Sequence, residues 1–498
     1  MSNVNRKMAA GIAWMSLMRL AIKGLGLAST VVLARLLLPA DFGIVAMAVS
    51  IIAALELFST FNFDVALIQR QDAERADYDT AWTFNVLFGT VLALLLVAGS
   101  YPAADFYNEP RLSHVMQVLA IGVFVLGFEN IGVVAFRKDL VFHKEFAIRI
   151  AQKVGGTAVT LPLAFALRSY WALVIGIVAG NVLAVLISYY AHPFRPRLSL
   201  ASARRLLSFS KWLAVNNVLW FMRDRLPDFL LGRISGAAAL GVYSLSYELS
   251  HLPTAEIVAP INRAVMPAYA KMAHDPELLR RGFLDVIGLI VLLALPAGFG
   301  IAAAARLIVT VVLGDSWVAA IPIVSVLGLV GALNALQTNC GSVHYALGRP
   351  RTMTVVAAVQ LATLLPTLFF GVYQAGAIGI AWAYLANHVL VSAPFLYFVT
   401  LRALQLPLRR LLALCWRPVI ATGVMYFGVR AAVGWVPTPS LVALLAVIGT
   451  GALGYGAVIV ILWLAAGRPA GPEKMAVDKF MLPVWRRVAT GLGSTAAR

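Results

Sequence analysis

Long stretches of apolar residues without charges recur along almost the whole of this 498-residue chain. Each is roughly 18–25 residues long, which is enough for an α-helix to cross about 30 Å of hydrocarbon. Hydrophobic residues make up 61% of the chain and charged residues only 12%, which is too little charge to cover the surface of a water-soluble protein of this size. The pattern predicts an all-α polytopic membrane protein.

The apolar runs predict about fourteen transmembrane helices joined by short polar segments. The expected spans cover residues 11–38, 42–63, 81–99, 113–135, 149–167, 171–191, 212–232, 240–262, 283–305, 317–340, 353–371, 376–399, 413–433 and 441–465. The first run is longer than the apolar core of a signal peptide, so we expect an uncleaved span there.

Lysine and arginine are distributed unevenly over the segments between these spans. The basic segments fall on alternate sides of the membrane and include Arg6, Lys7, residues 137–149, residues 195–211 and the tail after residue 467. The opposite side has little beyond Arg111, Arg168, Arg233, Arg306 and Arg430. This positive-inside asymmetry places both termini in the cytoplasm. It also accounts for the net charge of +18, so we expect no nucleic-acid partner.

A weak internal repeat indicates two halves. The stretch "LARLLLPADFGIVAMA" (33–48) aligns with "LGRISGAAALGVYSLS" (231–246), and the matches include Gly43 with Gly241. Six spans in each copy would give two parallel lobes around a central cavity, with two helices added at the end. The expected domains are an N-lobe at 1–195, a basic cytoplasmic connector at 196–211, a C-lobe at 212–400, two further spans at 401–466 and a basic cytoplasmic tail at 467–498.

Motifs for enzymatic chemistry are missing from the sequence. It has no P-loop, no H-E-x-x-H motif and no clustered Cys and His ligands. Its two cysteines, Cys340 and Cys415, give neither a disulfide framework nor a metal spacing. We therefore expect no catalytic residue, no metal site and no cofactor.

Cations inside the expected spans are the main functional signal. Arg19 and Lys23 lie on one face of the first span, and Lys23 lies close to the middle of the bilayer. A cation at the centre of a span costs roughly 2.5–3.5 kcal/mol on insertion scales, so these side chains are expected to face a wet cavity that can receive an anion. Snorkelling to the inner surface is the alternative, mainly for Arg19.

The seventh span carries two more cations beside two acids, in "FMRDRLPDFLLGR". Arg223 and Arg225 are candidate substrate-binding residues, or they pair with Asp224 and Asp228 in a structural network.

Three acidic residues are candidates for binding a coupling ion: Asp64, Glu248 and Glu256. Glu248 and Glu256 are alternatively counter-charges to a neighbouring arginine. Glu129 and Lys153 are expected to form a structural ion pair.

Several stretches are similar to one transporter family: "LARLLLPADFGIVAMA", "DVALIQRQD", "DTAWTFNVLFG", "ADFYNEPRL" and "YWALVIG". On these, the chain resembles the polysaccharide transport family, the Wzx-like flippases, of the multidrug/oligosaccharidyl-lipid/polysaccharide exporter superfamily. The resemblance continues more loosely through "LLGRISGAAALGVYSLSYEL" and "LGDSWVAAIPIVSVLGL". Asp64 departs from it, since a small residue such as Gly is expected at that position.

The resemblance implies two six-helix bundles around a cationic cavity in a bacterial inner membrane. Members flip an undecaprenyl-pyrophosphate-linked oligosaccharide to the outer leaflet by alternating access, for capsule, exopolysaccharide or O-antigen assembly. The implied partners are this lipid-linked sugar, membrane lipids and the polymerase or export machinery, and the drive would be membrane potential or a gradient of H⁺ or Na⁺. A cation-coupled drug exporter is the first alternative, and a membrane-embedded polysaccharide polymerase or ligase is the second.

Overall fold

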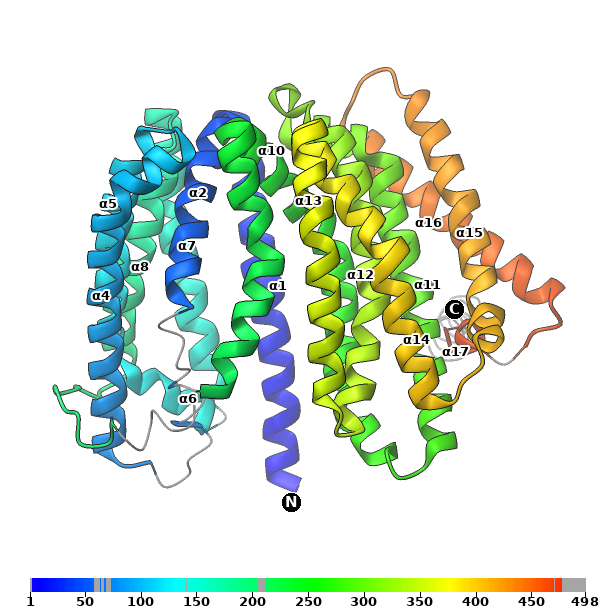
Figure 1. Ribbon diagram of the computed structural model, residues 1–498, viewed down its shortest axis with the longest axis horizontal. Helices are drawn as coiled ribbons and strands as arrows, with labels where there is room; N and C mark the ends of the chain where they lie inside the picture. Colours follow the sequence, from blue (N-terminus) through cyan, green and yellow to red (C-terminus); the bar gives the residue numbers. More distant parts are fainter. Residues whose placement is uncertain are drawn as a thin grey trace, which may run out of the picture. The chain divides into compact units, whose positions relative to one another are not determined.

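A computed structural model describes residues 2–57, 63, 67–68, 73–139, 141–203, 211–469 and 471–476 (Figure 1). The described residues form helices and connecting turns without a β-strand, which confirms the all-α prediction. The helices of the first half are α1 (Ser2–Leu36), α2 (Pro39–Glu56), α4 (Arg75–Tyr107), α5 (Arg111–Leu126), η1 (Ile131–Val133), α6 (Val134–Lys138), α7 (Phe142–Leu167), α8 (Trp171–Ala191) and α10 (Lys211–Met272). Those of the second half are α11 (Pro276–Ile308), η2 (Val309–Leu313), η3 (Asp315–Trp317), α12 (Ala320–Ala346), α13 (Pro350–Asn387), η4 (His388–Ser392), α14 (Ala393–Leu404), α15 (Leu408–Gly434), α16 (Leu441–Ala465) and α17 (Pro472–Ala476).

Local chemistry sets several of the helix boundaries. Pro39 and Pro276 stand at the first positions of α2 and α11, where a missing amide hydrogen costs nothing. The side chain of Asp275 accepts hydrogen bonds from the backbone amides of Glu277 and Leu278, and so caps the N-terminus of α11. At the C-terminal end of α4, Asn108 takes the left-handed conformation that often stops a helix.

Eleven of the described helices are long and apolar enough to cross a membrane. The number becomes twelve if the bent pair Arg111–Leu126 and Ile131–Lys138, which meet at 63°, is counted as one span. A multi-pass membrane protein is therefore confirmed, but the predicted number of fourteen is not. Reaching fourteen would require counting the two sides of the backbone breaks in α10 and α13 separately.

The break in α13 is a reversal of the chain. Ala375 and Gly376 leave the helical conformation there, and Gly376 has a positive φ of 58°. Across the break, the side chain of Asn387 donates a hydrogen bond of 2.9 Å to the hydroxyl of Thr363, 24 residues earlier in the chain. The two sides of the break consequently run beside each other as a hairpin.

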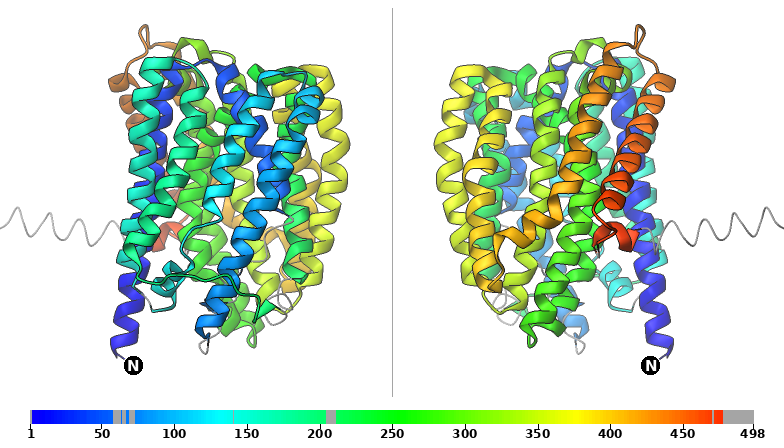
Figure 2. Two further views of the ribbon diagram at one scale, coloured as in Figure 1. Left: turned by 90° about the vertical axis from the view of Figure 1, so that its left-hand side faces the viewer. Right: turned by 90° about the vertical axis from the view of Figure 1, so that its right-hand side faces the viewer.

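The chain divides into two compact units, Met1–Ser244 and Leu245–Arg498, here called unit 1 and unit 2 and each described by itself. The lobe boundaries expected near residues 195 and 212 stay a prediction. In unit 1, α7 packs against α1 and α8, and α5 packs against α4 and α8. In unit 2, α11 packs against α12 and α15, and α15 lies beside α16 (Figure 2).

Two glycines allow α2 and α10 to approach closely within unit 1. A Cβ atom on Gly43 would lie 1.7 Å from the carbonyl oxygen of Ala237, and one on Gly241 would lie 1.9 Å from that of Pro39. No side chain fits at either position without moving the backbone. Gly43 and Gly241 are the residues that the internal repeat matches, and the same sequence offset relates Pro39 to Ala237. The contact is therefore reciprocal between the two copies of the repeat.

Candidate functional site

The cations of the first span lie on the part of α1 that packs against α7. Trp14 contacts Phe146 with ring centroids 5.0 Å apart, and further along the helix Lys153 reaches Gly26. The Nζ atom of Lys153 is 3.8 Å from the position that a Cβ atom on Gly26 would take. At 100° per residue, Gly26 shares one face of α1 with Arg19 and Lys23. Three cations therefore gather along one helix–helix seam, here called the cationic seam: Arg19, Lys23 and Lys153.

Two members of the cationic seam have no counter-charge within the described ranges. Lys23 is exposed and Lys153 half-buried, and neither amino group lies within 4.0 Å of a carboxylate in the described part of the chain. Two ammonium groups in hydrocarbon without partners would together cost several kcal/mol, so both require water or an anion beside them. Arg19 is half-buried on the same face.

The two arginines of the seventh span are paired with acids on the same helix. Arg223 lies 3.3 Å from Asp224, and Arg225 lies 3.2 Å from Asp228. The side chain of Asp224 is 50% exposed and that of Arg225 is 41% exposed, so one partner of each pair is exposed. The structure therefore records the pairing that the sequence left as an alternative to substrate binding.

Asp228 also fixes α10 against α2. The hydroxyl of Ser50 donates a hydrogen bond of 2.9 Å to its carboxylate, and both residues are buried. The carboxylate thus joins a neutral donor on one helix to a guanidinium on its own helix, which satisfies a buried charge.

Two of the three coupling candidates belong to unit 2, and the third has no described position. Glu248 is exposed and Glu256 is half-buried on the second part of α10, in unit 2. Asp64 lies outside the described residues.

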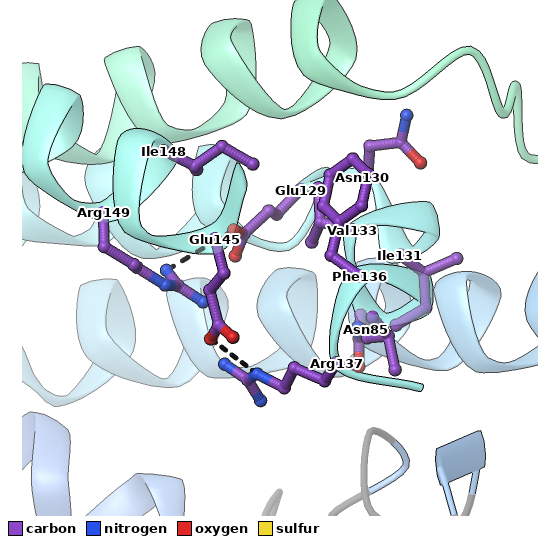
Figure 3. Close-up of a pocket in the computed structure, with 11 residues that line it drawn as sticks. Asn85, Glu129, Asn130, Ile131, Val133, Phe136, Arg137, Glu145, Ile148 and Arg149 are labelled. Carbon is purple, nitrogen blue, oxygen red and sulfur yellow. Dashed lines mark hydrogen bonds and ion pairs between the residues drawn. The ribbon is translucent and has the colours of Figure 1, made fainter. Parts of the chain in front are cut away.

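A second group of charges surrounds a cavity of about 50 Å³ where the fourth span is broken (Figure 3). Arg149 lies 3.6 Å from Glu129, and the Nε atom of Arg137 donates a hydrogen bond of 2.6 Å to Glu145. The expected ion pair of Glu129 with Lys153 is therefore wrong. Arg149, one helical turn earlier on α7, takes the place of Lys153, whose chain extends toward α1 instead.

The break itself is fixed by Asn130, which is fully buried. Its amide group donates hydrogen bonds to the carbonyl oxygens of His192 and Phe194, and its Oδ1 atom accepts one from the backbone amide of Gly132. A Cβ atom on Gly132 would overlap the His192 ring. The residues that interrupt the helix are thus held by the segment that follows α8.

Unit 2 contains a different kind of polar cluster. Ser392, in the π-helical turn η4, accepts a hydrogen bond of 2.7 Å from Gln360 and donates one of 2.7 Å to Gln337. The hydroxyl of Tyr269, on α10, donates a hydrogen bond of 3.0 Å to the Oδ1 atom of Asn339, on α12. These partners are uncharged. No group of three His, Cys, Asp or Glu residues that could hold a metal ion occurs in the residues that the structure describes.

Sequence reasoning missed Lys153 as a member of the cationic seam and Glu145 as a buried acid. The signal for Lys153 was the glycine at position 26, which leaves room for a long side chain between α1 and α7. No signal in the sequence distinguished Glu145 from an ordinary surface acid in a basic loop.

Comparison with known proteins agrees with this architecture. The family described as "polysaccharide biosynthesis protein" matches residues 32–322. The lipopolysaccharide biosynthesis protein WzxC of Escherichia coli K12 is 27% identical over 408 residues, which cover 80% of this chain and 82% of that protein.

Two solved structures share the fold. The lipid II flippase MurJ, in an inward closed conformation, superimposes with a TM-score of 0.74 at 12% identity, over 92% of this chain and all of MurJ. A multidrug resistance MATE transporter of the MOP superfamily, in an inward-facing conformation, gives a TM-score of 0.60 at 14% identity, over 79% of this chain and 99% of that one. The chain is a multi-pass membrane protein with the fold of these transporters, and because the family match spans more than half of its length it belongs to the polysaccharide biosynthesis protein family.

Proposed function

We propose that this protein is a flippase that moves an oligosaccharide linked to undecaprenyl pyrophosphate from the inner to the outer leaflet of a bacterial inner membrane. The family, the relatives in polysaccharide biosynthesis and the transporter fold support a carrier of lipid-linked sugars rather than an enzyme. The observation that carries the proposal is the pair of ammonium groups on Lys23 and Lys153, which have no counter-charge among the residues that the structure describes.

A diphosphate needs fixed positive charge to leave water. Hydrogen bonds to charged groups stabilise a bound anion more than neutral ones do, and a low local dielectric strengthens the attraction. The cationic seam between α1 and α7 offers the guanidinium of Arg19 and two ammonium groups that no carboxylate of the described residues neutralises. The sugar would cross in water next to this seam, while the prenyl chain stays in lipid.

Arg223 and Arg225 have a conditional role in this proposal. Their acidic partners are near neighbours on α10, and both pairs are partly exposed. A phosphate that reaches them would exchange with a carboxylate, so these arginines bind the cargo more weakly than Lys23 and Lys153 do.

Lobes that rock about a two-fold axis would alternate access to the cationic seam. The reciprocal contact of Gly43 and Gly241 supports this, since a two-fold relation produces paired contacts of this kind. The proposal keeps both termini in the cytoplasm, coupling to H⁺ or Na⁺ with Glu248 or Glu256 as candidate sites, and a polymerase or export system that receives the product.

The direct test is reconstitution into liposomes with a fluorescent undecaprenyl-pyrophosphate sugar and a quencher outside. The double variant Lys23→Ala/Lys153→Ala should lower the rate of translocation at least about 100-fold, because each lost charge-assisted hydrogen bond is worth about 1.5–3 kcal/mol and the two together about 3–6 kcal/mol. The control is Lys271→Ala, an exposed lysine near the end of α10, which should keep the wild-type rate.

Two results would contradict the proposal. The first is a double variant that folds and translocates the lipid at the rate of the control. The second is wild-type protein that moves cationic drugs across the membrane but not the lipid-linked sugar.

A further inference from the structure

We propose that the groove between the end of α14 and the start of α15 binds one anionic phospholipid of the membrane, with the phosphate of the lipid at Arg402 and an acyl chain along Phe398. The groove belongs to unit 2, whereas the cationic seam belongs to unit 1. This lipid site goes beyond the proposed function and does not depend on it.

The groove has the size of a ligand site and lies at a membrane surface. Its volume is about 850 Å³, within the range of about 300–1,000 Å³ that small-molecule sites span. α14 ends at Leu404 and α15 begins at Leu408, and both belong to stretches apolar enough to cross a membrane (Figure 1). The turn between them therefore lies at the level of the lipid headgroups. Among the described residues that line the groove, only Arg402 and Gln405 are neither apolar nor aromatic.

One side of α14 leads from the apolar part of the groove to its charge. Pro394, Phe398 and Arg402 are spaced four residues apart, so they follow one another along the helix at about 6 Å per step. All three are exposed, and the side chain of Phe398 is 61% exposed. This order matches a phospholipid, whose phosphate stays at the surface while its acyl chain runs towards the middle of the bilayer.

The floor of the groove is formed without a ligand. The hydroxyl of Tyr397 donates a hydrogen bond of 2.9 Å to the carbonyl oxygen of Leu336 on α12. Leu401 and Leu406, which also line the groove, are buried in the hydrophobic core of unit 2. A lipid that enters the groove therefore meets a surface that is already ordered, which lowers the entropic cost of binding.

The rim of the groove is a turn in a strained conformation. Gln405 has a positive φ of 51°, which a residue other than glycine keeps only where its surroundings hold it. Arg280 holds it by donating hydrogen bonds to the carbonyl oxygen of Leu404, at 2.6 Å, and to the Oε1 atom of Gln405, at 2.9 Å. The Nε2 atom of Gln405, which has no hydrogen-bond partner among the described residues, can then donate to an anion in the groove.

The charges around the groove select an anionic lipid. Arg402 lines the groove, and the exposed Arg409 and Arg410 follow in the first turn of α15. In the described part of the chain, no carboxylate lies within 4.0 Å of these three guanidinium groups, and Glu277 is paired with Arg280 and Arg281 instead. A guanidinium group binds a phosphate through two parallel hydrogen bonds, and basic pockets between membrane helices attract anionic headgroups.

The end of the chain is a less favourable occupant than a lipid. Residues 477–498 contain four basic side chains and one acidic side chain, Asp478. The arginines at the groove would repel this excess of positive charge, whereas they attract a phosphate.

Photo-crosslinking of the full-length protein identifies the occupant directly. We would place p-benzoylphenylalanine at position 398 and irradiate the protein in vesicles of phosphatidylglycerol and phosphatidylethanolamine. Mass spectrometry should find adducts of the anionic phosphatidylglycerol enriched at least about 5-fold over the composition of the vesicle, the factor that one arginine near an anionic headgroup supplies.

Two arginine variants show whether the enrichment comes from the groove. Arg402→Gln should lower it about 5-fold, and its side chain is exposed, so the change removes no core contact. The control is Arg430→Gln, which removes an exposed arginine near the other end of α15 and should leave the enrichment as it is. Equal enrichment in the two variants, or adducts that follow the vesicle composition without either change, would overturn the lipid site.

Native mass spectrometry of the purified protein separates a lipid from a free phosphate. One phosphatidylglycerol should stay bound in excess inorganic phosphate, because its acyl chain adds apolar contacts that the free ion lacks. Displacement by inorganic phosphate overturns the lipid site, since the groove would then bind any phosphate.

Other occupants of position 398 also overturn the proposal. A cross-link to residues 477–498 or to a second copy of the chain would show that a protein segment fills the groove. Displacement of phosphatidylglycerol by the lipid-linked sugar would make the groove part of the transport path. Enriched phosphatidylglycerol adducts in a protein that fails to move the lipid-linked sugar contradict the proposed function and leave the lipid site intact.

Discussion

Units 1 and 2 handle buried polarity in different ways. In unit 1 the polar contacts at the broken fourth span include two ion pairs beside the neutral hydrogen bonds of Asn130, and they join Glu129 to Arg149 and Glu145 to Arg137. The first part of α10 adds the pair of Arg225 and Asp228.

In unit 2, several contacts between helices are neutral hydrogen bonds. Gln360, Ser392 and Gln337 form a chain across α13, η4 and α12, and Tyr269 bonds Asn339. Neutral bonds of this kind are insensitive to pH and salt, whereas buried ion pairs change when a proton or an anion arrives. We therefore expect pH, salt and bound anions to affect the contacts between helices in unit 1 more than those in unit 2.

The largest expected effect tests an exception in unit 2. Arg417 on α15 and Glu473 on α17 form an ion pair whose side chains are 6% and 1% exposed. Arg417→Ala should lower the free energy of unfolding by about 3–5 kcal/mol, because it leaves a buried carboxylate without a partner. Thermal unfolding in detergent measures this.

Arg281→Ala is the matched control for that variant. Its side chain is 72% exposed in a pair with Glu277, so the loss should stay below about 1 kcal/mol. Equal midpoints for the two variants would mean that α17 does not stabilise unit 2.

The next effect concerns the charged link of unit 1. Asp228→Ala removes the acceptor of Ser50 and the partner of Arg225, and should cost about 1.5–3 kcal/mol, the usual range for hydrogen bonds to a charged group. Asp224→Ala removes a half-exposed acid four residues earlier and should cost less than about 1 kcal/mol. If the two variants unfold at the same temperature, Asp228 is not the residue that fixes α10 to α2.

A smaller loss is expected from the neutral chain of unit 2. Ser392→Ala breaks the hydrogen bonds with Gln360 and Gln337 and should cost about 1 kcal/mol. Ser325→Ala removes only a bond to the Ile321 carbonyl of its own helix and should be nearly neutral. The loss in Ser392→Ala should be the same at low and high salt, and a strong salt dependence would remove the distinction between the units.

The smallest effect is a pH dependence at the surface of unit 1. Arg111 donates two hydrogen bonds to Glu109, at 2.7 and 2.9 Å, and this lowers the pKa of Glu109. The folded state therefore gains stability above the ordinary pKa of a glutamate, and loses it as pH falls through the lowered value.

The size of that gain is less than about 1 kcal/mol, because the Arg111 side chain is half exposed and water screens the pair. Thermal midpoints of wild type and Glu109→Gln, compared from neutral to acidic pH, measure it. Curves that stay parallel throughout would show that the ion pair contributes nothing to folding.

The sequence by itself determined the class of protein, a multi-pass membrane protein built of helices, and the family, but not the number of spans. These follow from length, hydropathy and local motifs, which act over one helix at a time: a run of apolar residues must cross lipid as a helix whatever its neighbours are. The sequence also placed Arg19 and Lys23 on one face, since helical periodicity requires nothing from other helices.

Only the tertiary structure decided which charges meet. Glu129 pairs with Arg149, one helical turn before Lys153 on α7. The side chain of Lys153 extends toward Gly26 of α1 instead. The bend after α5 brings Arg137 to Glu145, which is buried. Partner choice among long charged side chains depends on distances of a few Å between helices far apart in sequence, and the energy of a charge pair changes steeply over that range.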